Sequence, residues 1–194
     1  MDGVKNVLAG VITARVIYND EYAPLRDARN FIAYHSKTLP PISPADYLRR
    51  IANYGGFSPS VLLLGLYYID RLALHDQRFL VTSFNVNRLL ITAIMLACKY
   101  LEDLKFSLHH FAVIGGVSAR ELQELEVDML MRLQFSLAVA PDELNAYRRR
   151  LADEFLHLDC NNFDLRGKCT AAPRKSNPQQ EFRPLQPLLP PHRV

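Results

Sequence analysis

Helix start signals recur through the middle of the chain. A serine that can cap a helix is followed by proline at Ser43-Pro44 and again at Ser58-Pro59, and apolar residues follow each pair. Ser118 and Glu121 have the spacing of a capping box, again before apolar residues at helical spacing. Since no segment shows the clean alternation and hairpin turns of β-strands, the sequence predicts an all-α fold.

The same signals predict the extent of each helix. We expect about five helices between Ile42 and Leu137, and glycine pairs end two of them at Gly55-Gly56 and Gly115-Gly116. An earlier helix is expected to end at Asn19-Asp20. The predicted ranges are 4–17, 25–35, 43–54, 58–74, a helix from Ser83 or Asn85 to about 101, 108–114, 118–133 and 141–155.

The composition changes near the end of the chain. Six of the twelve prolines fall between Pro173 and Val194, which is typical of an extended or disordered segment. The stretches 184–187 and 187–190 have the minimal pattern of a proline-helix ligand, although a plain linker is the commoner explanation. We therefore divide the chain into an N-terminal helical extension (1–38), a helical box with the helix that follows it (39–157) and a proline-rich tail (158–194).

Composition and motifs also argue against several classes of function. The net charge of +3 comes from mixed signs, so nucleic acid is not an expected partner. The longest apolar run, 89–98, is too short to span a bilayer, and we expect no membrane association. Three widely spaced cysteines, Cys98, Cys160 and Cys169, suit a reduced intracellular compartment, cytoplasmic or nuclear. Without a metal-ligand spacing, phosphate loop or nucleophile motif, we expect no metal, no cofactor and no enzymatic activity.

The segment 85–101 is apolar almost all round, which predicts a helix buried at the centre of the domain. One narrow stripe is the exception and carries Asn85, Arg88, Thr92, Met95 and Lys99. The helix does not need this stripe for packing against the core of its own domain, so the stripe can face water or a partner. Lys99 also has a simpler explanation, because a cation is favoured at a helix C-terminus.

The segment 121–133 shows the opposite pattern. Glu126 lies within its apolar stripe, which consists of Leu122, Leu125, Met129, Leu130 and Leu133. A carboxylate in that position needs a donor, because leaving it dry and unpaired is costly. The donor can be internal or can belong to a partner, unless Glu126 lies at the edge of the core.

Asp70 raises the same question, because it lies in the mostly buried run 66–72. An internal ion pair is the simplest solution. Arg50 flanks the apolar face of the preceding helix, whereas Arg49 points away from that face. We therefore predict a structural ion pair between Arg50 and Asp70.

Six spaced segments carry a resemblance to a known family. They are Ile42-Ser43-Pro44-Ala45-Asp46-Tyr47-Leu48-Arg49-Arg50-Ile51, Tyr67-Tyr68-Ile69-Asp70-Arg71-Leu72, Ser83-Phe84-Asn85-Val86-Asn87-Arg88-Leu89-Leu90-Ile91-Thr92, Leu96-Ala97-Cys98-Lys99-Tyr100-Leu101-Glu102-Asp103, Gly115-Gly116-Val117-Ser118, and Leu125-Glu126-Val127-Asp128-Met129-Leu130 with Leu133-Gln134-Phe135. In this order they resemble the cyclin box over roughly residues 40–150. The narrower similarity is to P- and U-type cyclins, the group of the yeast phosphate-response cyclin.

The resemblance implies a five-helix cyclin box whose third and fifth helices face a cyclin-dependent protein kinase. In that family a lysine ending the third helix and a glutamate in the fifth contact the kinase beside its C-helix, and by motif position these are Lys99 and Glu126. Arg88, Thr92 and Met95, from the same stripe as Lys99, are then also expected at the kinase. The family pairs a second-helix aspartate with a first-helix arginine, which matches Asp70 and Arg50.

We therefore expect a regulatory subunit that is a monomer when free, forms a heterodimer with a cyclin-dependent kinase and activates it, in cell-cycle control or phosphate signalling. The alternative is a helical adaptor that uses the same fold to bind proteins without activating a kinase. A degenerate box would be expected to lose Lys99 or Glu126, and this chain keeps both. The docking-groove sequence of cell-cycle cyclins is not found in the first box helix, and no second box is recognisable.

Overall fold

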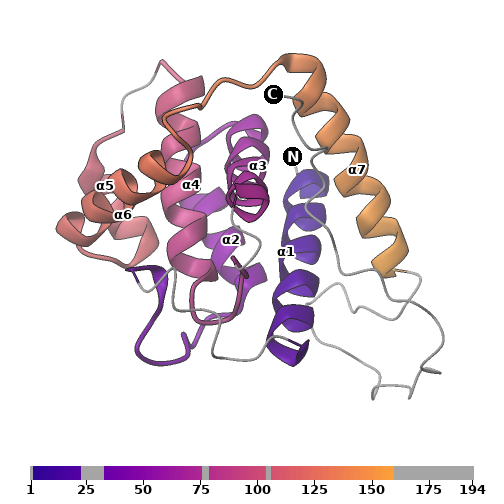
Figure 1. Cartoon of the computed structure of the whole chain (residues 1–194), viewed down its shortest axis with the longest axis horizontal. Coiled ribbons are helices and arrows are strands. Elements are labelled where there is room, and N and C mark those ends of the chain that lie inside the picture. Colours follow the sequence, from indigo (N-terminus) through magenta and orange to yellow (C-terminus); the bar gives the residue numbers. More distant parts are fainter. Residues whose placement is uncertain (1, 23–32, 76–78, 104–105, 160–194) are drawn as a thin grey trace.

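The computed structural model describes residues 2–22, 33–75, 79–103 and 106–159. These residues form seven helices and no strand (Figure 1), which confirms the all-α prediction. The helices are α1 (Asp2–Tyr22), α2 (Pro44–Tyr54), α3 (Pro59–His75), α4 (Val86–Leu101), α5 (Leu108–Gly115), α6 (Ala119–Arg132) and α7 (Pro141–Asp159). Most of the helix predicted over 25–35, and the tail from residue 160, lie outside the described residues.

Serine side chains begin three of the helices. The hydroxyls of Ser43, Ser107 and Ser118 each accept a hydrogen bond from the backbone N–H three residues further on, at 3.1, 3.2 and 3.1 Å. These bonds satisfy N–H groups that have no partner within the helix. The starts predicted at Ser43 and Ser118 are confirmed, and Ser107 adds a third start of the same kind.

The glycine pair after α5 ends that helix as predicted. Gly116 has a φ of 68°, in the left-handed region where glycine is favoured. Its N–H donates to the carbonyl of Val113 at 3.3 Å, and the N–H of Val117 donates to that of Ala112 at 3.1 Å. Two of the last carbonyls of the helix are therefore paired before the chain turns into α6.

α1 differs from its prediction, because it continues through Asn19 and Asp20 to Tyr22. Such side chains often end helices by bonding to their own backbone. Here they bond to the segment before α4 instead. The Asn19 amide donates to the carbonyl of Val81 at 2.8 Å, and the Asp20 carboxylate accepts from the N–H and the hydroxyl of Ser83. The helix is therefore left intact.

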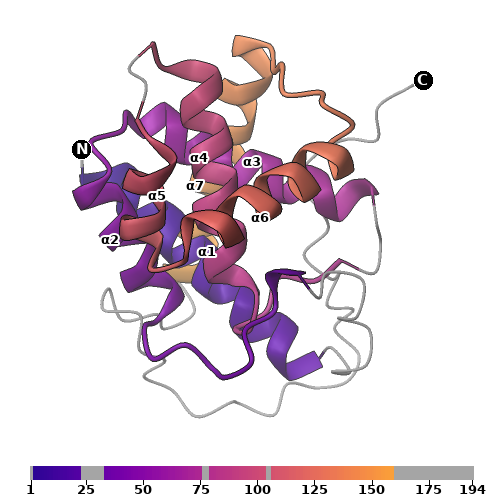
Figure 2. The same cartoon turned by 90° about the vertical axis from the view of Figure 1, so that its left-hand side faces the viewer.

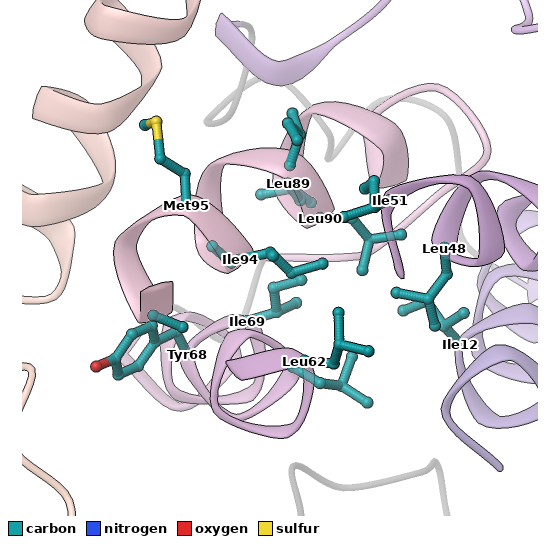
Figure 3. Packing of buried hydrophobic residues seen from close by; sticks show 14 of the residues in the cluster. Ile12, Leu48, Ile51, Leu62, Tyr68, Ile69, Leu89, Leu90, Ile94 and Met95 are labelled. Atoms are coloured by element: carbon teal, nitrogen blue, oxygen red, sulfur yellow. The ribbon is translucent and has the colours of Figure 1, made fainter. Parts of the chain in front are cut away.

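α3 and α4 form the centre of the molecule. Gly65 of α3 permits their close approach, because a Cβ atom there would lie 2.8 Å from Cγ1 of Ile94. Figure 1 shows α1 and α7 side by side on one flank of this pair and α5 and α6 on the other. Ile12 of α1 packs into the same cluster as Leu48 of α2 and Ile69 of α3 (Figure 3). The N-terminal helix is therefore an integral part of the core.

None of the described helices combines the length and the apolar character that crossing a bilayer would need.

Candidate functional site

α4 leaves the core at its C-terminal end. Every residue from 89 to 98 is buried, whereas Lys99, Tyr100 and Leu101 are exposed. A cation and two large side chains with apolar surface therefore lie together where the helix emerges. The burial of the remainder confirms the prediction of a central helix.

α6 lies across α4 and turns a narrow face toward the core (Figure 2). Val127 and Met131 lie four residues apart on its outer side, and Met131 is 62% exposed. Neither residue belongs to the apolar stripe that the sequence predicts to be buried. We define the α4/α6 surface as Lys99, Tyr100, Leu101, Glu126, Val127 and Met131.

Lys99 and Glu126 form an ion pair within this surface. The Nζ atom of Lys99 lies 2.6 Å from Oε1 of Glu126, and the carboxylate is less exposed than the amine. Glu126 had been expected to need a donor, and the structure supplies one from α4 of the same chain. The pair holds two charges at fixed positions next in sequence to Tyr100 and Val127, and it can exchange hydrogen bonds with a bound protein.

Further polar contacts attach α6 to the rest of the molecule. Arg88 of α4 forms an ion pair with Glu121 at 2.6 Å. The hydroxyl of Tyr34 donates to the carbonyl of Leu125 at 3.1 Å from the opposite side, and burial raises the pKa of Tyr34 above its usual value. The spacing of Ser118 and Glu121 predicts that Glu121 acts in the helix start. Because Glu121 pairs with Arg88, both side chains lie in the contact between α4 and α6.

Thr92 and Met95 correct the prediction of a free stripe on α4. Both side chains are fully buried, and the Thr92 hydroxyl donates to the carbonyl of Arg88 at 2.7 Å. α6 packs against α4, and the apolar stripe of α6 belongs to the same buried cluster as Met95. Thr92 and Met95 therefore belong to the core. Of the residues predicted to face a partner, only those outside the buried middle of the stripe remain accessible.

The predicted Arg50–Asp70 pair is wrong. Asp70 binds Arg15 of α1 at 2.7 Å and accepts a hydrogen bond from the Tyr147 hydroxyl of α7 at 2.7 Å. Arg15 also binds Glu154 of α7 through two N–H groups, at 3.0 and 2.8 Å. Arg50 remains at the surface, where it donates to the carbonyl of Val113 at 3.3 Å.

Arg15, Asp70, Tyr147 and Glu154 therefore form one buried network that joins α1, α3 and α7. Burial disfavours the charged guanidinium of Arg15, but the carboxylates of Asp70 and Glu154 outweigh it and hold the pKa of Arg15 above its usual value. Burial and the Asp70 carboxylate likewise raise the pKa of Tyr147. The network ties the two terminal helices to the box.

Within the described part of the chain, no three His, Cys, Asp or Glu side chains gather as potential metal ligands. Cys98 is a buried free thiol, and burial raises its pKa to about 11. The residues of the α4/α6 surface combine fixed charges with exposed apolar side chains.

Comparison with known proteins finds a matching family model and several similar proteins. The family model described as Cyclin matches residues 13–137. The chain is 40% identical over 125 residues to Cyclin-U4-1 of Arabidopsis thaliana, which covers 64% of this chain and 62% of the relative. It is 37% identical over 127 residues to Cyclin-P4-1 of Oryza sativa subsp. japonica, covering 66% and 60%.

A fungal relative matches as well. The chain is 38% identical over 142 residues to the Nuc-1 negative regulatory protein preg of Neurospora crassa, which covers 73% of this chain and 29% of the relative. In each of these three comparisons the chain spans less than two thirds of the relative's length.

Proposed function

The chain belongs to the cyclin family, and we propose that it is a regulatory subunit that binds and activates a cyclin-dependent protein kinase. The α4/α6 surface is the docking surface, and it packs on the C-helix of the kinase. The observation that carries the proposal is the Lys99–Glu126 ion pair, flanked by the exposed residues Tyr100 and Val127. These are the two charged positions that the family resemblance implies at the kinase.

The composition of the surface supports a protein partner. Tyr100 and Leu101 of α4 and Met131 of α6 are exposed side chains with apolar area, and exposed apolar side chains are typical of interaction sites. The apolar side chains would supply the buried area. Lys99 and Glu126 would fix the register, because charge-assisted hydrogen bonds demand a defined geometry.

Activation follows from differential binding. An isolated kinase of this class needs its C-helix correctly placed before its Lys–Glu ion pair and its metal-binding aspartate are aligned for phosphoryl transfer. A subunit that binds only the aligned state shifts the population toward it. Moving such an equilibrium from 1:99 to 99:1 takes about a 10⁴-fold difference in affinity between the two states. The chain itself then contributes no catalytic group.

The test is reconstitution with a panel of purified cyclin-dependent kinases. Each kinase is assayed on histone alone, with the wild-type chain, and with the Lys99→Ala/Glu126→Ala variant. The matched control is Asp46→Ala/Arg49→Ala, which removes an ion pair of 3.0 Å from the outside of α2. We expect at least one kinase to gain activity with the wild type and the control, and to lose most of that gain with the double variant.

Two results would contradict the proposal. Binding without any rise in activity would instead support a non-activating adaptor. Activation that is equally strong with Lys99→Ala/Glu126→Ala would show that a kinase is bound through another surface. Circular dichroism and thermal unfolding on each variant check that the fold is retained, because the Lys99–Glu126 pair also attaches α6 to α4.

A further inference from the structure

Arg71 is a buried cation without an anionic partner. The residue is only 8% exposed. Its Nη1 donates to the carbonyl of Ser136 at 2.8 Å, its Nη2 donates to the Ser136 hydroxyl at 3.2 Å, and its guanidinium lies 5.9 Å from the centre of the Tyr67 ring. None of these groups carries a negative charge.

Arg15 provides a comparison with Arg71, because its guanidinium is also largely buried. Arg15 has two carboxylate partners, Asp70 and Glu154. By contrast, no carboxylate of the described residues pairs with Arg71, and the nearby Glu143 accepts from the Tyr67 hydroxyl instead. Since burying a charge without a counter-charge is costly, the difference between the two arginines calls for an anion at Arg71.

The donors of Arg71 are only partly used. A guanidinium has five N–H groups, and two of them bond to Ser136. The Nε atom is buried and has no hydrogen-bond partner among the described residues. Ser136 is exposed, so the end of the Arg71 side chain lies directly beneath a surface residue.

The backbone beside Arg71 is strained. Gln134 and Phe135 have φ values of 53° and 54°, a left-handed conformation that is unfavourable for side chains as large as these. Arg71 holds the next residue, Ser136, through both of its bonds, while Phe135 is 67% exposed. Backbone strain of this kind concentrates at binding sites. The strained segment directly follows α6 and so borders the α4/α6 surface.

We propose that Arg71 and the hydroxyl of Ser136 bind an oxyanion, a carboxylate or a phosphate group, carried by the protein that docks on the α4/α6 surface. Phe135 lies beside the site, so the group is expected to sit next to an apolar residue of the partner. A guanidinium fork suits this chemistry, since two parallel N–H groups match two oxygens of a carboxylate or a phosphate. The identity of the carrier rests on the proposed function, whereas the oxyanion site itself does not.

The first experiment tests the site in the free chain. The arginine Nε–Hε signals of the ¹⁵N-labelled protein are followed by NMR during titration with acetate or phenyl phosphate, with chloride keeping the ionic strength constant. The signal missing in Arg71→Lys identifies Arg71. We expect this signal to shift saturably with at least one probe, and Ser136→Ala to weaken the affinity about threefold by removing one hydrogen-bonding group.

Arg148→Gln is the matched control, because Arg148 is an exposed arginine of α7 and its loss should leave the titration unchanged. The site is refuted if the Arg71 signal does not move, or if all arginine signals move in parallel. Thermal unfolding of each variant checks the fold. If replacement of Arg71 unfolds the chain, the titration of Ser136→Ala still tests the site.

The second experiment identifies the source of the oxyanion. The labelled chain is mixed with the kinase that it activates. We expect the Arg71 signal to shift on complex formation and to become insensitive to phenyl phosphate, and Arg71→Gln to weaken kinase binding by at least about tenfold. If Arg71 in the complex still responds to phenyl phosphate, the partner does not supply the group. If no kinase binds, the proposed function fails while the free-chain titration still decides the site.

Discussion

α4 and α6 are neighbours that are held in place in different ways. Eleven of the 16 residues of α4 are buried, compared with three of the 14 residues of α6. α4 is fixed by apolar packing on all sides, whereas α6 has one narrow apolar stripe and is secured by the Arg88–Glu121 and Lys99–Glu126 ion pairs. The comparison separates two tasks. The α3–α4 pair forms the centre of the core, and α6 keeps most of its residues outside the core.

Disrupting the buried network of Arg15, Asp70, Tyr147 and Glu154 should lower the free energy of unfolding more than the other substitutions do. Asp70→Ala removes a carboxylate from Arg15 and an acceptor from Tyr147, so we expect a loss of about 3–5 kcal/mol in the free energy of unfolding, as for other broken buried pairs. Arg50→Ala should change the free energy of unfolding by less than about 0.5 kcal/mol, because Arg50 is exposed. Urea denaturation measures both. Equal effects would restore the Arg50–Asp70 pairing.

Truncation on the two helices should separate their roles. Leu89→Ala in the buried part of α4 should cost about 2–5 kcal/mol of unfolding free energy, since it leaves a cavity. Met131→Ala on the outer side of α6 should cost less than about 0.5 kcal/mol. Its effect should instead appear as weaker kinase binding in a titration. A large stability loss from Met131→Ala would mean that the outer side of α6 belongs to the core.

Gly65 and Gly10 allow a contact with backbone, which is rigid, to be compared with a contact with a side chain, which can move. In Gly65→Ala, the new Cβ would lie 2.8 Å from Cγ1 and 3.1 Å from Cα of Ile94. We expect a net loss of about 1 kcal/mol, because overpacking outweighs the helical preference for alanine. In Gly10→Ala the new Cβ meets only the ring of Phe155, a half-buried side chain that can move. Thermal unfolding should therefore show a lower Tm for Gly65→Ala than for Gly10→Ala, and the reverse order would contradict this packing.

The smallest effect concerns Cys98 at the end of the buried part of α4. Burial raises the pKa of its thiol from 9.0 to about 11 in the folded chain. The stability this contributes is complete below pH 9 and is lost as the pH rises through 11, because the unfolded thiol ionises first. Between pH 9 and 10 the wild type should lose about 1 kcal/mol more than Cys98→Ala in urea titrations. Parallel pH profiles would show that the thiol ionises freely.

The helices could be predicted from sequence because their signals are local. Ser43 and Ser118 cap the helices at which they were placed, since a cap involves residues three positions apart. The partner of Asp70 could not be predicted in the same way. Arg15 reaches it from a helix 55 residues earlier, and only packing decides which cation arrives. A signal did exist, because Arg15 lies on the same face of α1 as the buried residues Leu8 and Ile12.

Only part of the α4/α6 surface could be predicted from the sequence. Lys99 and Glu126 stood out because each breaks the pattern of its own helix, and the structure brings them together. Thr92 and Met95 differ from the prediction, because a stripe that is unlike the rest of α4 can still be buried by neighbouring helices, and both side chains are fully buried. Val127 and Met131 carried a weak signal as apolar residues outside the buried stripe of α6.

Hydrogen–deuterium exchange with an activating kinase tests the central claim most directly. The measurement compares backbone exchange in the free chain and in the complex. Binding through the α4/α6 surface predicts slower exchange in segments 99–103 and 119–135, with little change in α1 and α7. Slower exchange confined to α1 and α7, with α6 unchanged, would contradict the account.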